Sequence, residues 1–356
     1  MSADPTMAAV RAWRTDAIRR IEADYNRSAD THLIRLDLPR YPGITLYLKD
    51  ESSHPTGSLK HRLARSLFLY ALCNGWIGPD TCIIEASSGS TAVSEAYFAR
   101  MLGLRFIAVV PATTAAPKLD AIRFHGGEIH AVDDPAPSMT SRIAWRPRRA
   151  AIISTSSPMP SGRPIGAATT ISPRVSSPRW RTRSIPFPPG SSAARGRGTS
   201  ATIGRYIGYQ RHATRLCVAD PVHSVFHRHF GDRTVTSLPD GCASRIEGIG
   251  RPRVEPSFIP SVIDRMIAVE DAASIGAMRA LSTRLGRRVG GSTGTNLIAC
   301  AQLIEEMAAA GERGRSSPCY AMGANAMAAP IMTTTGWPSA TSTGRRASRV
   351  SNACCR

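Results

Sequence analysis

Apolar residues recur along the chain at two spacings, one typical of amphipathic helices and one typical of buried strands. From residue 8 to residue 23 they follow at three- and four-residue intervals among arginines and acids, which predicts a surface helix. Further along, short apolar runs alternate with longer stretches of helical spacing. These patterns predict strands at 30–36, 44–48, 82–84, 106–110 and 215–218, and helices at 58–71, at 91–102 and from 198 onward. Strands and helices in alternation favour an α/β fold.

Length and cysteine usage narrow the class of protein. The 356 residues suffice for two α/β domains, each with its own core. No apolar run is long enough to span a membrane, and no charged-then-apolar signal segment opens the chain, so we expect a cytoplasmic protein without membrane contact. The eight cysteines form neither a Cys-x-x-Cys pair nor a His/Cys metal spacing, so we expect no metal site.

Lysine is rare in this chain, and one lysine stands where chemistry could use it. The sequence holds Lys49, Lys60 and Lys118 against 42 arginines. Lys118 falls in a helical pattern and is expected to be solvated. Lys60 follows the turn sequence Pro-Thr-Gly-Ser at residues 55–58 and begins a helical stretch. Because an amine forms a Schiff base and a guanidinium does not, Lys60 is the candidate for covalent chemistry.

Three segments, in order, resemble the motifs of one enzyme family. Residues 54–62 read His-Pro-Thr-Gly-Ser-Leu-Lys-His-Arg, close to the Asn-Pro-Thr-Gly-Ser-x-Lys-x-Arg signature of the fold-type II pyridoxal-phosphate enzymes of the cysteine synthase and cystathionine β-synthase family. His54 and His61 are departures from that signature. Residues 85–91 and 290–296 resemble two further family motifs. Alone, the first segment is equally typical of an ordinary capped helix start, but three motifs in order favour the family.

The resemblance implies roles for the first two motifs. Lys60 would hold pyridoxal 5'-phosphate as a Schiff base and act as the base at the substrate Cα. The substrate carboxylate would bind at a helix N-terminus, to the loop formed by Ser87, Ser88, Gly89, Ser90 and Thr91. A serine-rich N-cap without a ligand would have the same sequence. Ser90 also takes the place of a family asparagine that hydrogen-bonds the ring hydroxyl of the cofactor.

The resemblance also implies cofactor contacts in the second half of the chain. Ser292 would meet the pyridine nitrogen of the cofactor, and its alternative reading is an ordinary turn serine. Gly196, Gly198 and Thr199 would belong to the loop that wraps the cofactor phosphate. Gly248 would lie in a loop beside the bound amino-acid substrate.

The family fold and activity follow as expectations. The fold would be that of a tryptophan synthase β-like enzyme, with two three-layer αβα domains and the cofactor between them. Residues 1–40 and 198–314 would form the larger cofactor domain, and residues 41–137 the smaller substrate-loop domain. The 87–91 loop looks most like that of a cysteine desulfhydrase, which converts L-cysteine to pyruvate, ammonia and hydrogen sulfide. Cysteine synthase activity on O-acetylserine and threonine dehydratase-like chemistry stay open, and the family implies a homodimer.

Two basic segments do not fit a folded enzyme. The net charge is +19, yet residues 138–197 contain eleven arginines and residues 315–356 contain five, and neither segment has an acid or a leucine. Without these sixteen charges the remainder carries only +3. We expect both segments to be poorly ordered. A disordered nucleic-acid-binding arm is one reading, but because aromatics are only 6% of the chain we expect no specific nucleic-acid partner.

A shifted reading frame explains both segments better. If the true frame starts on the third base of each visible codon, residues 190–196 can encode Trp-Ile-Val-Gly-Gly-Ala-Gly, similar to the family's strand and phosphate loop. Residues 164–172 and 319–327 hide two further family-like stretches in that register. We therefore predict frameshifts at about 138–197 and 315–356. Pro-Pro-Gly-Ser-Ser at 188–192 would then replace the strand before the phosphate loop, so we expect weak cofactor binding or a catalytically impaired remnant.

Overall fold

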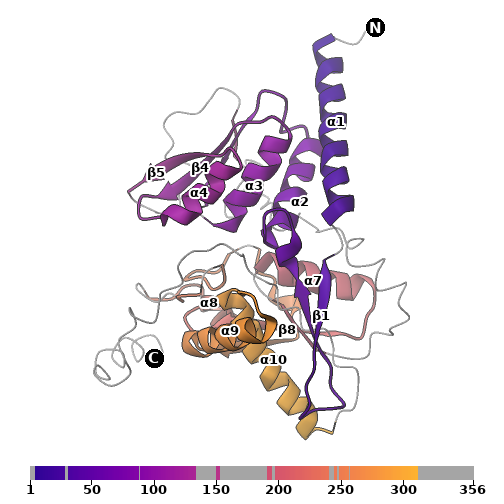
Figure 1. Ribbon diagram of the computed structural model, residues 1–356, viewed down its shortest axis with the longest axis vertical. Helices are drawn as coiled ribbons and strands as arrows, with labels where there is room; N and C mark the ends of the chain where they lie inside the picture. The colour runs from indigo at the N-terminus through magenta and orange to yellow at the C-terminus, as the bar shows by residue number, and fades with distance from the viewer. Residues whose placement is uncertain are drawn as a thin grey trace. The chain divides into compact units, whose positions relative to one another are not determined.

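The computed structural model describes residues 5–28, 31–87, 89–133, 150–152, 191–194, 197–239, 244–246, 248–255 and 257–311 (Figure 1). Its helices are α1 (Pro5–Ser28), α2 (Lys60–Cys73), α3 (Ser90–Met101), α4 (Ala116–Phe124), α7 (Arg197–Tyr209), α8 (Val225–Gly231), α9 (Asp271–Leu285) and α10 (Gly291–Ala309). Its strands are β1 (His32–Leu36), β2 (Leu46–Asp50), β3 (Cys82–Glu85), β4 (Phe106–Pro111), β5 (Glu128–Val132), β6 (Ala150–Ile152), β7 (Ser191–Ala194), β8 (Arg215–Pro221) and β9 (Arg265–Val269). Short 3-10 helices occupy Glu51–Ser53 and Pro260–Val262.

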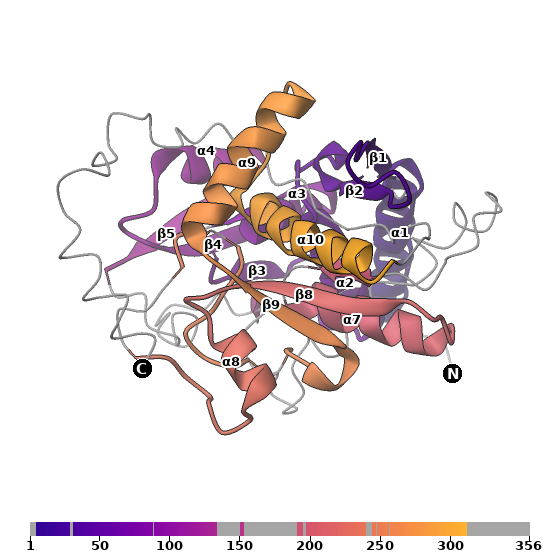
Figure 2. The same cartoon turned by 90° about the horizontal axis from the view of Figure 1, so that it is seen from below.

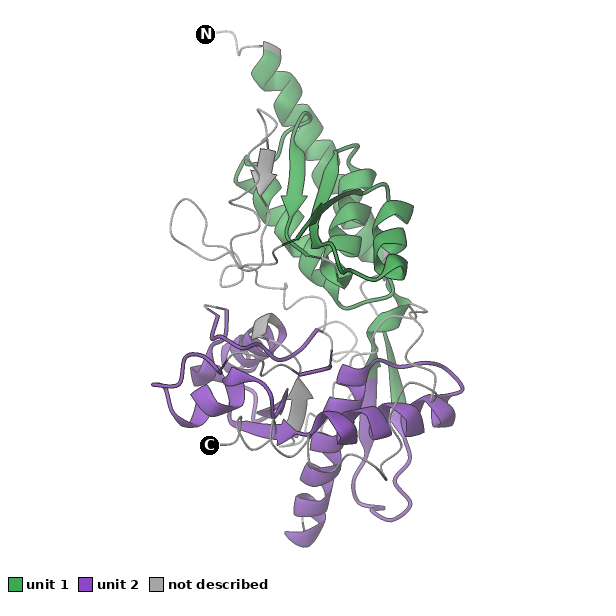
Figure 3. Ribbon diagram, turned by 90° about the vertical axis from the view of Figure 1, so that its left-hand side faces the viewer, with its two compact units in different colours: residues 1–34, 49–186, 322–325 green, residues 35–48, 187–321, 326–356 purple. Residues whose placement is uncertain are grey.

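The chain divides into two compact units (Figure 3). The first unit contains residues 1–34 and 49–186, and the second contains residues 35–48 and 187–321. Strands β1 and β2, which carry the chain out of the first unit and back, pair with each other in a two-stranded sheet. The residues beyond 311 lie outside the described part of the chain.

The first unit is built on a parallel sheet with strand order β5-β4-β3-β6. Strands β3 and β4 are buried along almost their whole length, as expected of parallel strands that are covered on both faces. Helix α3 packs against β4 and against helix α2. Because β3 runs directly into the 86–90 loop before α3, this loop lies at the carboxyl end of an inner strand, where open α/β sheets bind ligands.

Helix α1 belongs to the first unit, whereas the family resemblance implied that residues 1–40 group with residues 198–314. The reason lies in contacts with residues distant in sequence. The carboxylate of Asp24 lies 2.8 Å from Nε2 of His61 on α2 and accepts a 2.7 Å hydrogen bond from the hydroxyl of Tyr97 on α3. A helical spacing within residues 8–23 carries no information about such partners.

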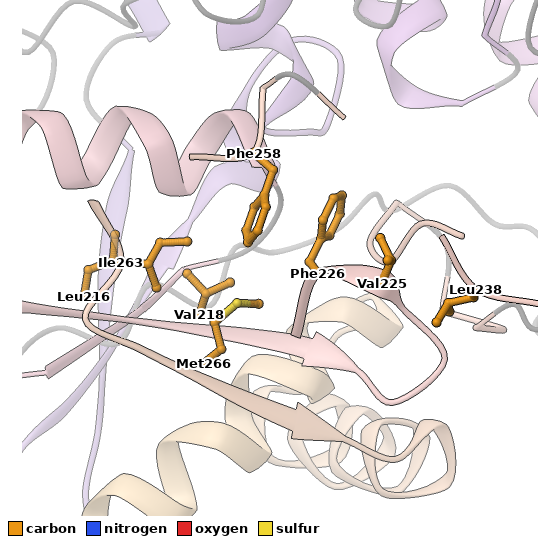
Figure 4. Packing of buried hydrophobic residues seen from close by; sticks show 8 residues of the cluster. All are labelled: Leu216, Val218, Val225, Phe226, Leu238, Phe258, Ile263 and Met266. Carbon is orange, nitrogen blue, oxygen red and sulfur yellow. The ribbon is translucent and has the colours of Figure 1, made fainter. Parts of the chain in front are cut away.

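The second unit contains the parallel sheet β7-β8-β9 between two helical layers. Successive side chains of a strand face opposite sides, so β8 and β9 contribute to two cores. One core joins Cys217, Ala219, Ile267 and Val269 to Ala299 and Leu303 of α10. The other joins Leu216, Val218 and Met266 to Val225, Phe226, Leu238, Phe258 and Ile263 (Figure 4). Helix α10 thus covers one face and α8 the other (Figure 2), which confirms the predicted αβα layering for this unit.

Most predicted elements of residues 58–110 are confirmed. The predicted strands 82–84 and 106–110 correspond to β3 and β4, and the predicted helices 58–71 and 91–102 correspond to α2 and α3, with ends displaced by two residues or fewer. Among the described residues, no helix combines the length and apolar character needed to cross a membrane.

The arginine-rich segment 138–197 contributes two short strands to the sheets. Strand β6 pairs in parallel with β3, and β7 pairs in parallel with β8. We expected Pro188 and Pro189 to abolish the strand before the phosphate loop; instead β7 begins after both prolines, at Ser191, because non-proline residues keep the N–H groups that a ladder needs. The rest of 138–196 and all of 315–356 lie outside the described residues.

Candidate active site

Lys60 is the first residue of α2, and the turn before it fixes its backbone. Gly57 has φ +65°, a left-handed conformation that favours glycine, and its N–H donates to the His54 carbonyl at 2.7 Å. The Ser58 hydroxyl accepts a 3.1 Å hydrogen bond from the N–H of Lys60, which satisfies one of the donors that a first helical turn leaves open. The Lys60 side chain is half-buried. The sequence therefore places its amine at a well-defined helix start.

A buried ionic cluster holds the two sides of this turn; we call it the Glu51 cluster. Arg62 donates to both carboxylate oxygens of Glu51, with the bond to Oε1 at 3.0 Å. Nε2 of His54 lies 2.8 Å from Oε2 of Glu51, and the Thr31 hydroxyl donates to Oε1 at 2.6 Å. Burial alone would raise the pKa of Glu51, but the His54 hydrogen bond and the Arg62 charge outweigh it and hold that pKa well below its usual range.

His61, the residue after Lys60, is fully buried and linked to the second motif. Its Nδ1 lies 3.2 Å from the Thr56 hydroxyl, which lies 2.9 Å from the Ser94 hydroxyl. Ser94 in turn donates to the Ser90 carbonyl at 2.8 Å. Burial lowers the pKa of His61, although the neighbouring Asp24 acts in the opposite direction. The structure thus connects the Lys60 turn with Ser90 through side chains that the sequence motifs did not single out for a role.

The predicted carboxylate loop lies at the start of α3. Gly89 is the N-cap residue in extended conformation, and its N–H donates to the Ser87 hydroxyl at 3.4 Å. Ser90 and Thr91 begin the helix and are half-buried, while Ser88 lies outside the described residues. The first N–H groups of a helix have no helical partner and carry its positive dipole end, so this position suits a carboxylate.

Two buried acids lie near this loop, and the sequence motifs predicted no role for either. Glu85 ends β3 and Glu95 lies in α3, and their exposed fractions are 1% and 0%. Burial and the charge of Glu85 raise the pKa of Glu95 well above its usual range. The raised pKa favours the neutral form of Glu95, which adds no repulsion to an anion bound at the start of its own helix.

In the second unit, helix α7 carries the described part of the predicted phosphate loop. Gly198 lies in its first turn and Thr199 is half-buried, whereas Gly196 lies outside the described residues. A Cβ at Gly204 would stand 2.4 Å from the Val262 carbonyl oxygen, so a glycine is needed for α7 to lie this close to the 260–262 segment. The start of α7 suits an anion by the same reasoning as the start of α3.

The remaining predicted residues lie on two other segments of the second unit. Ser292 is 2% exposed in the first turn of α10, and its hydroxyl makes no hydrogen bond within the part of the chain that the structure describes. Gly248 is exposed and has φ +84°, a conformation that favours glycine. Asp220, which the motifs did not reveal, is the last residue but one of β8 and accepts a 3.0 Å hydrogen bond from the His227 N–H. Burial raises the pKa of Asp220 to about 7.

These donor groups fit pyridoxal phosphate. The first unit supplies an amine at Lys60 and a helix start suited to a carboxylate. The second unit supplies a helix start suited to a phosphate at α7 and, at Ser292, a buried neutral hydroxyl with no described partner, which suits a ring nitrogen. The first group of residues belongs to one unit and the second group to the other.

Comparison with known proteins agrees with this set of residues. Residues 27–315 match the model of the family described as pyridoxal-phosphate dependent enzyme. The chain is 52% identical to the L-cysteine desulfhydrase Cds1 of Mycobacterium tuberculosis, over 85% of this chain and 84% of that protein. It is 29% identical to a putative cysteine synthase of Sinorhizobium fredii, over 77% of this chain and 80% of that protein. The chain belongs to the pyridoxal-phosphate dependent enzyme family.

Solved structures support the fold. An O-acetylserine dependent cystathionine β-synthase from Helicobacter pylori superposes with a TM-score of 0.65 at 23% identity, covering 80% of this chain and 90% of that one. An O-ureido-L-serine synthase gives the same TM-score at 20% identity and covers 94% and 98%. The fold-type II assignment made from the sequence motifs is therefore confirmed.

Proposed function

We propose that this chain is an L-cysteine desulfhydrase, which converts L-cysteine and water to pyruvate, ammonia and hydrogen sulfide. The 52% identity to a protein of that name, extending over 85% of the chain, carries the proposal. The serine-rich loop at 87–91 agrees with it. Cysteine synthase activity is the second candidate, supported by the more distant 29% identical relative.

Each predicted site residue takes a role in this proposal. Bound pyridoxal phosphate would supply the electron sink for negative charge at the substrate Cα. The Lys60 amine would hold the cofactor and take the Cα proton. The N–H groups and hydroxyls of Ser87, Ser88, Gly89, Ser90 and Thr91 would orient the substrate carboxylate.

The second unit would anchor the cofactor. Gly196, Gly198 and Thr199 would donate to its phosphate at the start of α7, and Ser292 would hydrogen-bond its ring nitrogen. Ser90 would approach the ring hydroxyl, and Gly248 would lie beside the amino-acid substrate. The domain assignment of residues 41–137 to substrate binding and of residues 198–314 to cofactor binding is part of the same proposal.

Sulfide release by the purified full chain is the decisive experiment. With added pyridoxal phosphate and L-cysteine, we expect sulfide and pyruvate in equal amounts, and we expect Lys60→Ala to lower the rate by about 10²–10⁴-fold, because it removes the base at Cα. Lys118→Ala on α4 is the matched control and should keep the parent rate. Rapid sulfide consumption with O-acetylserine, without sulfide release from cysteine, would favour the synthase instead.

The frameshift hypothesis leads to a separate comparison. The chain and its frame-corrected counterpart should be assayed side by side for visible absorbance of bound cofactor and for sulfide release. Activity in the corrected chain alone would identify the present sequence as an impaired remnant. A DNA sequence of the gene with an uninterrupted reading frame and no family match hidden in the third-base register would disprove the frameshift. The homodimer and the cytoplasmic location stay predictions, to be measured by light scattering and cell fractionation.

A further inference from the structure

A continuous chain of polar contacts runs from α1 to the first residue of α3 through the Lys60 turn; we call it the His61 chain. It joins the Asp24 carboxylate, the His61 ring, the Thr56 hydroxyl, the Ser94 hydroxyl and the Ser90 carbonyl. The four side chains have exposed fractions of 4%, 0%, 8% and 0% in that order. Solvent therefore contributes little to these contacts.

The four contacts need four hydrogens, and their number depends on the charge of His61. When Asp24 is ionised, its carboxylate and the Ser90 carbonyl only accept hydrogens. The hydroxyls of Thr56 and Ser94 supply one hydrogen each, and the imidazole supplies one when neutral and two when charged. Tyr97 donates to the other oxygen of Asp24, Oδ1, and adds no hydrogen to the chain. A neutral His61 thus leaves one contact without a hydrogen.

The missing hydrogen falls on the contact between the two active-site segments. With Nε2–H of a neutral His61 donated to Asp24, Thr56 donates to Nδ1, and Ser94 donates to the Ser90 carbonyl. The 2.9 Å contact between the Thr56 and Ser94 hydroxyls is then left without a donor. An imidazolium donates from Nδ1 to Thr56, which frees the Thr56 hydrogen for Ser94.

We propose that His61 is a positioning residue whose second proton completes the His61 chain and so couples the Lys60 turn to the Ser90 loop. The hydrogen count depends only on the four contacts. Its effect on catalysis rests on the proposed function. With His61 neutral, Thr56 and Ser94 are uncoupled, and the substrate loop is released from the turn that carries Lys60.

The surroundings of His61 set the pH at which the coupling forms. Asp24 faces it from α1, His54 stacks on it with ring centroids 5.1 Å apart, Tyr97 faces it from α3, and Arg65 belongs to its own helix. Burial lowers the pKa of His61 from 6.5, and the charges of His54 and Arg65 act in the same direction against Asp24. The His61 chain is therefore incomplete at neutral pH, and it becomes complete only at a pH below the ordinary value of 6.5.

The test is whether His61 responds to a hydroxyl that it does not touch. The pKa of His61 would be read from nitrogen NMR of its ring in the full-length protein, with the signal assigned by its absence in His61→Gln. Ser94→Ala removes the acceptor that the Thr56 hydrogen needs when His61 is charged. We expect the pKa of His61 to fall by about half a unit to one unit, the size of one net hydrogen bond.

Ser66→Ala is the matched control. The Ser66 hydroxyl donates to the carbonyl four residues earlier, as the Ser94 hydroxyl does. Ser66 lies on the same helix as His61 but takes no part in the His61 chain. We expect no shift in this variant. Thr56→Val should lower the pKa of His61 further than Ser94→Ala does, and Thr56→Ser should keep the parent value; this pair decides the question if Ser94→Ala does not fold.

An unchanged or raised pKa of His61 in Ser94→Ala would overturn the proposal. The measurement needs neither cofactor nor turnover, so its outcome is separate from that of the desulfhydrase assay. A lowered pKa of His61 in Ser94→Ala, in a protein that releases no sulfide, would support the His61 chain and reject the proposed function. Sulfide release with an unchanged pKa of His61 would support the proposed function and reject the coupling.

Discussion

The two units hold their candidate residues by different physical means. In the first unit, buried charges surround Lys60: the Glu51 cluster on one side of its turn and the His61–Asp24 pair on the other. In the second unit, glycines allow close backbone approach, at Gly204 against Val262 and at Gly294 against Ser274. The first arrangement depends on charge and pH, because a buried ion without its partner is costly, and the second depends on volume.

Of the changes that test this contrast, removing one buried charge should have the largest effect on the free energy of unfolding. Glu51→Gln leaves Arg62 without its carboxylate, and we expect a loss of about 3–5 kcal/mol in the free energy of unfolding, measured with urea. Glu306→Gln is the control, because its pair with Arg265 is 43% and 39% exposed and should contribute less than about 1 kcal/mol. Equal losses in the two variants would mean that burial does not distinguish these pairs.

The pH response of the Glu51 cluster follows from the same contacts. The folded-state pKa of Glu51 is held below its ordinary value of 4.5. The stability that it contributes is therefore present above pH 4.5 and lost as the pH falls below that value. Glu51→Gln should remove this part of the acid sensitivity.

Adding one carbon should test the volume dependence of the second unit. A Cβ at Gly294 would stand 1.9 Å from the Ser274 carbonyl oxygen, where α9 and α10 pack together. We expect Gly294→Ala to lower the free energy of unfolding by about 1–3 kcal/mol. Gly276→Ala, inside α9 with no atom within 4 Å of the new Cβ, should instead be neutral or stabilise by up to about 1 kcal/mol. Thermal unfolding of both variants would show whether helix spacing or glycine itself matters.

Asp220 offers the most pH-specific test, because it is a buried acid in the unit that otherwise depends on volume. Its folded-state pKa is raised from 3.8 to about 7, so its contribution to stability is present below pH 3.8 and lost as the pH rises towards 7. We expect Asp220→Asn to stabilise the protein at pH 8 by an amount on the order of 2 kcal/mol and to have no such effect at pH 3. Unfolding curves would be measured at both pH values. An equal effect at pH 3 and pH 8 would contradict the raised pKa of Asp220.

Local sequence patterns predicted the fold and the helix starts that carry the candidate residues, but they did not predict the contacts around those residues. Lys60, the 87–91 loop and Ser292 each belong to a short motif at a helix start, so the sequence alone could place them. The contacts of Asp24 and Thr31 could not be found in this way, because their partners His61 and Glu51 lie far along the chain. The strand at 191–194 was not predicted, because Pro188 and Pro189 were assumed to lie within it, whereas the strand begins after them.

The N-terminal arm, residues 5–31 including helix α1, contributes contacts to the buried groups around Lys60. Asp24 contacts His61, and Thr31 contacts Glu51, so both buried groups of the first unit depend on residues encoded before the first parallel strand. A protein expressed from a start site beyond residue 31 would keep every recognisable motif and yet lose a partner from each group. Trimming the arm to shorten the protein for crystallisation would therefore remove contacts that support the turn carrying its candidate catalytic lysine.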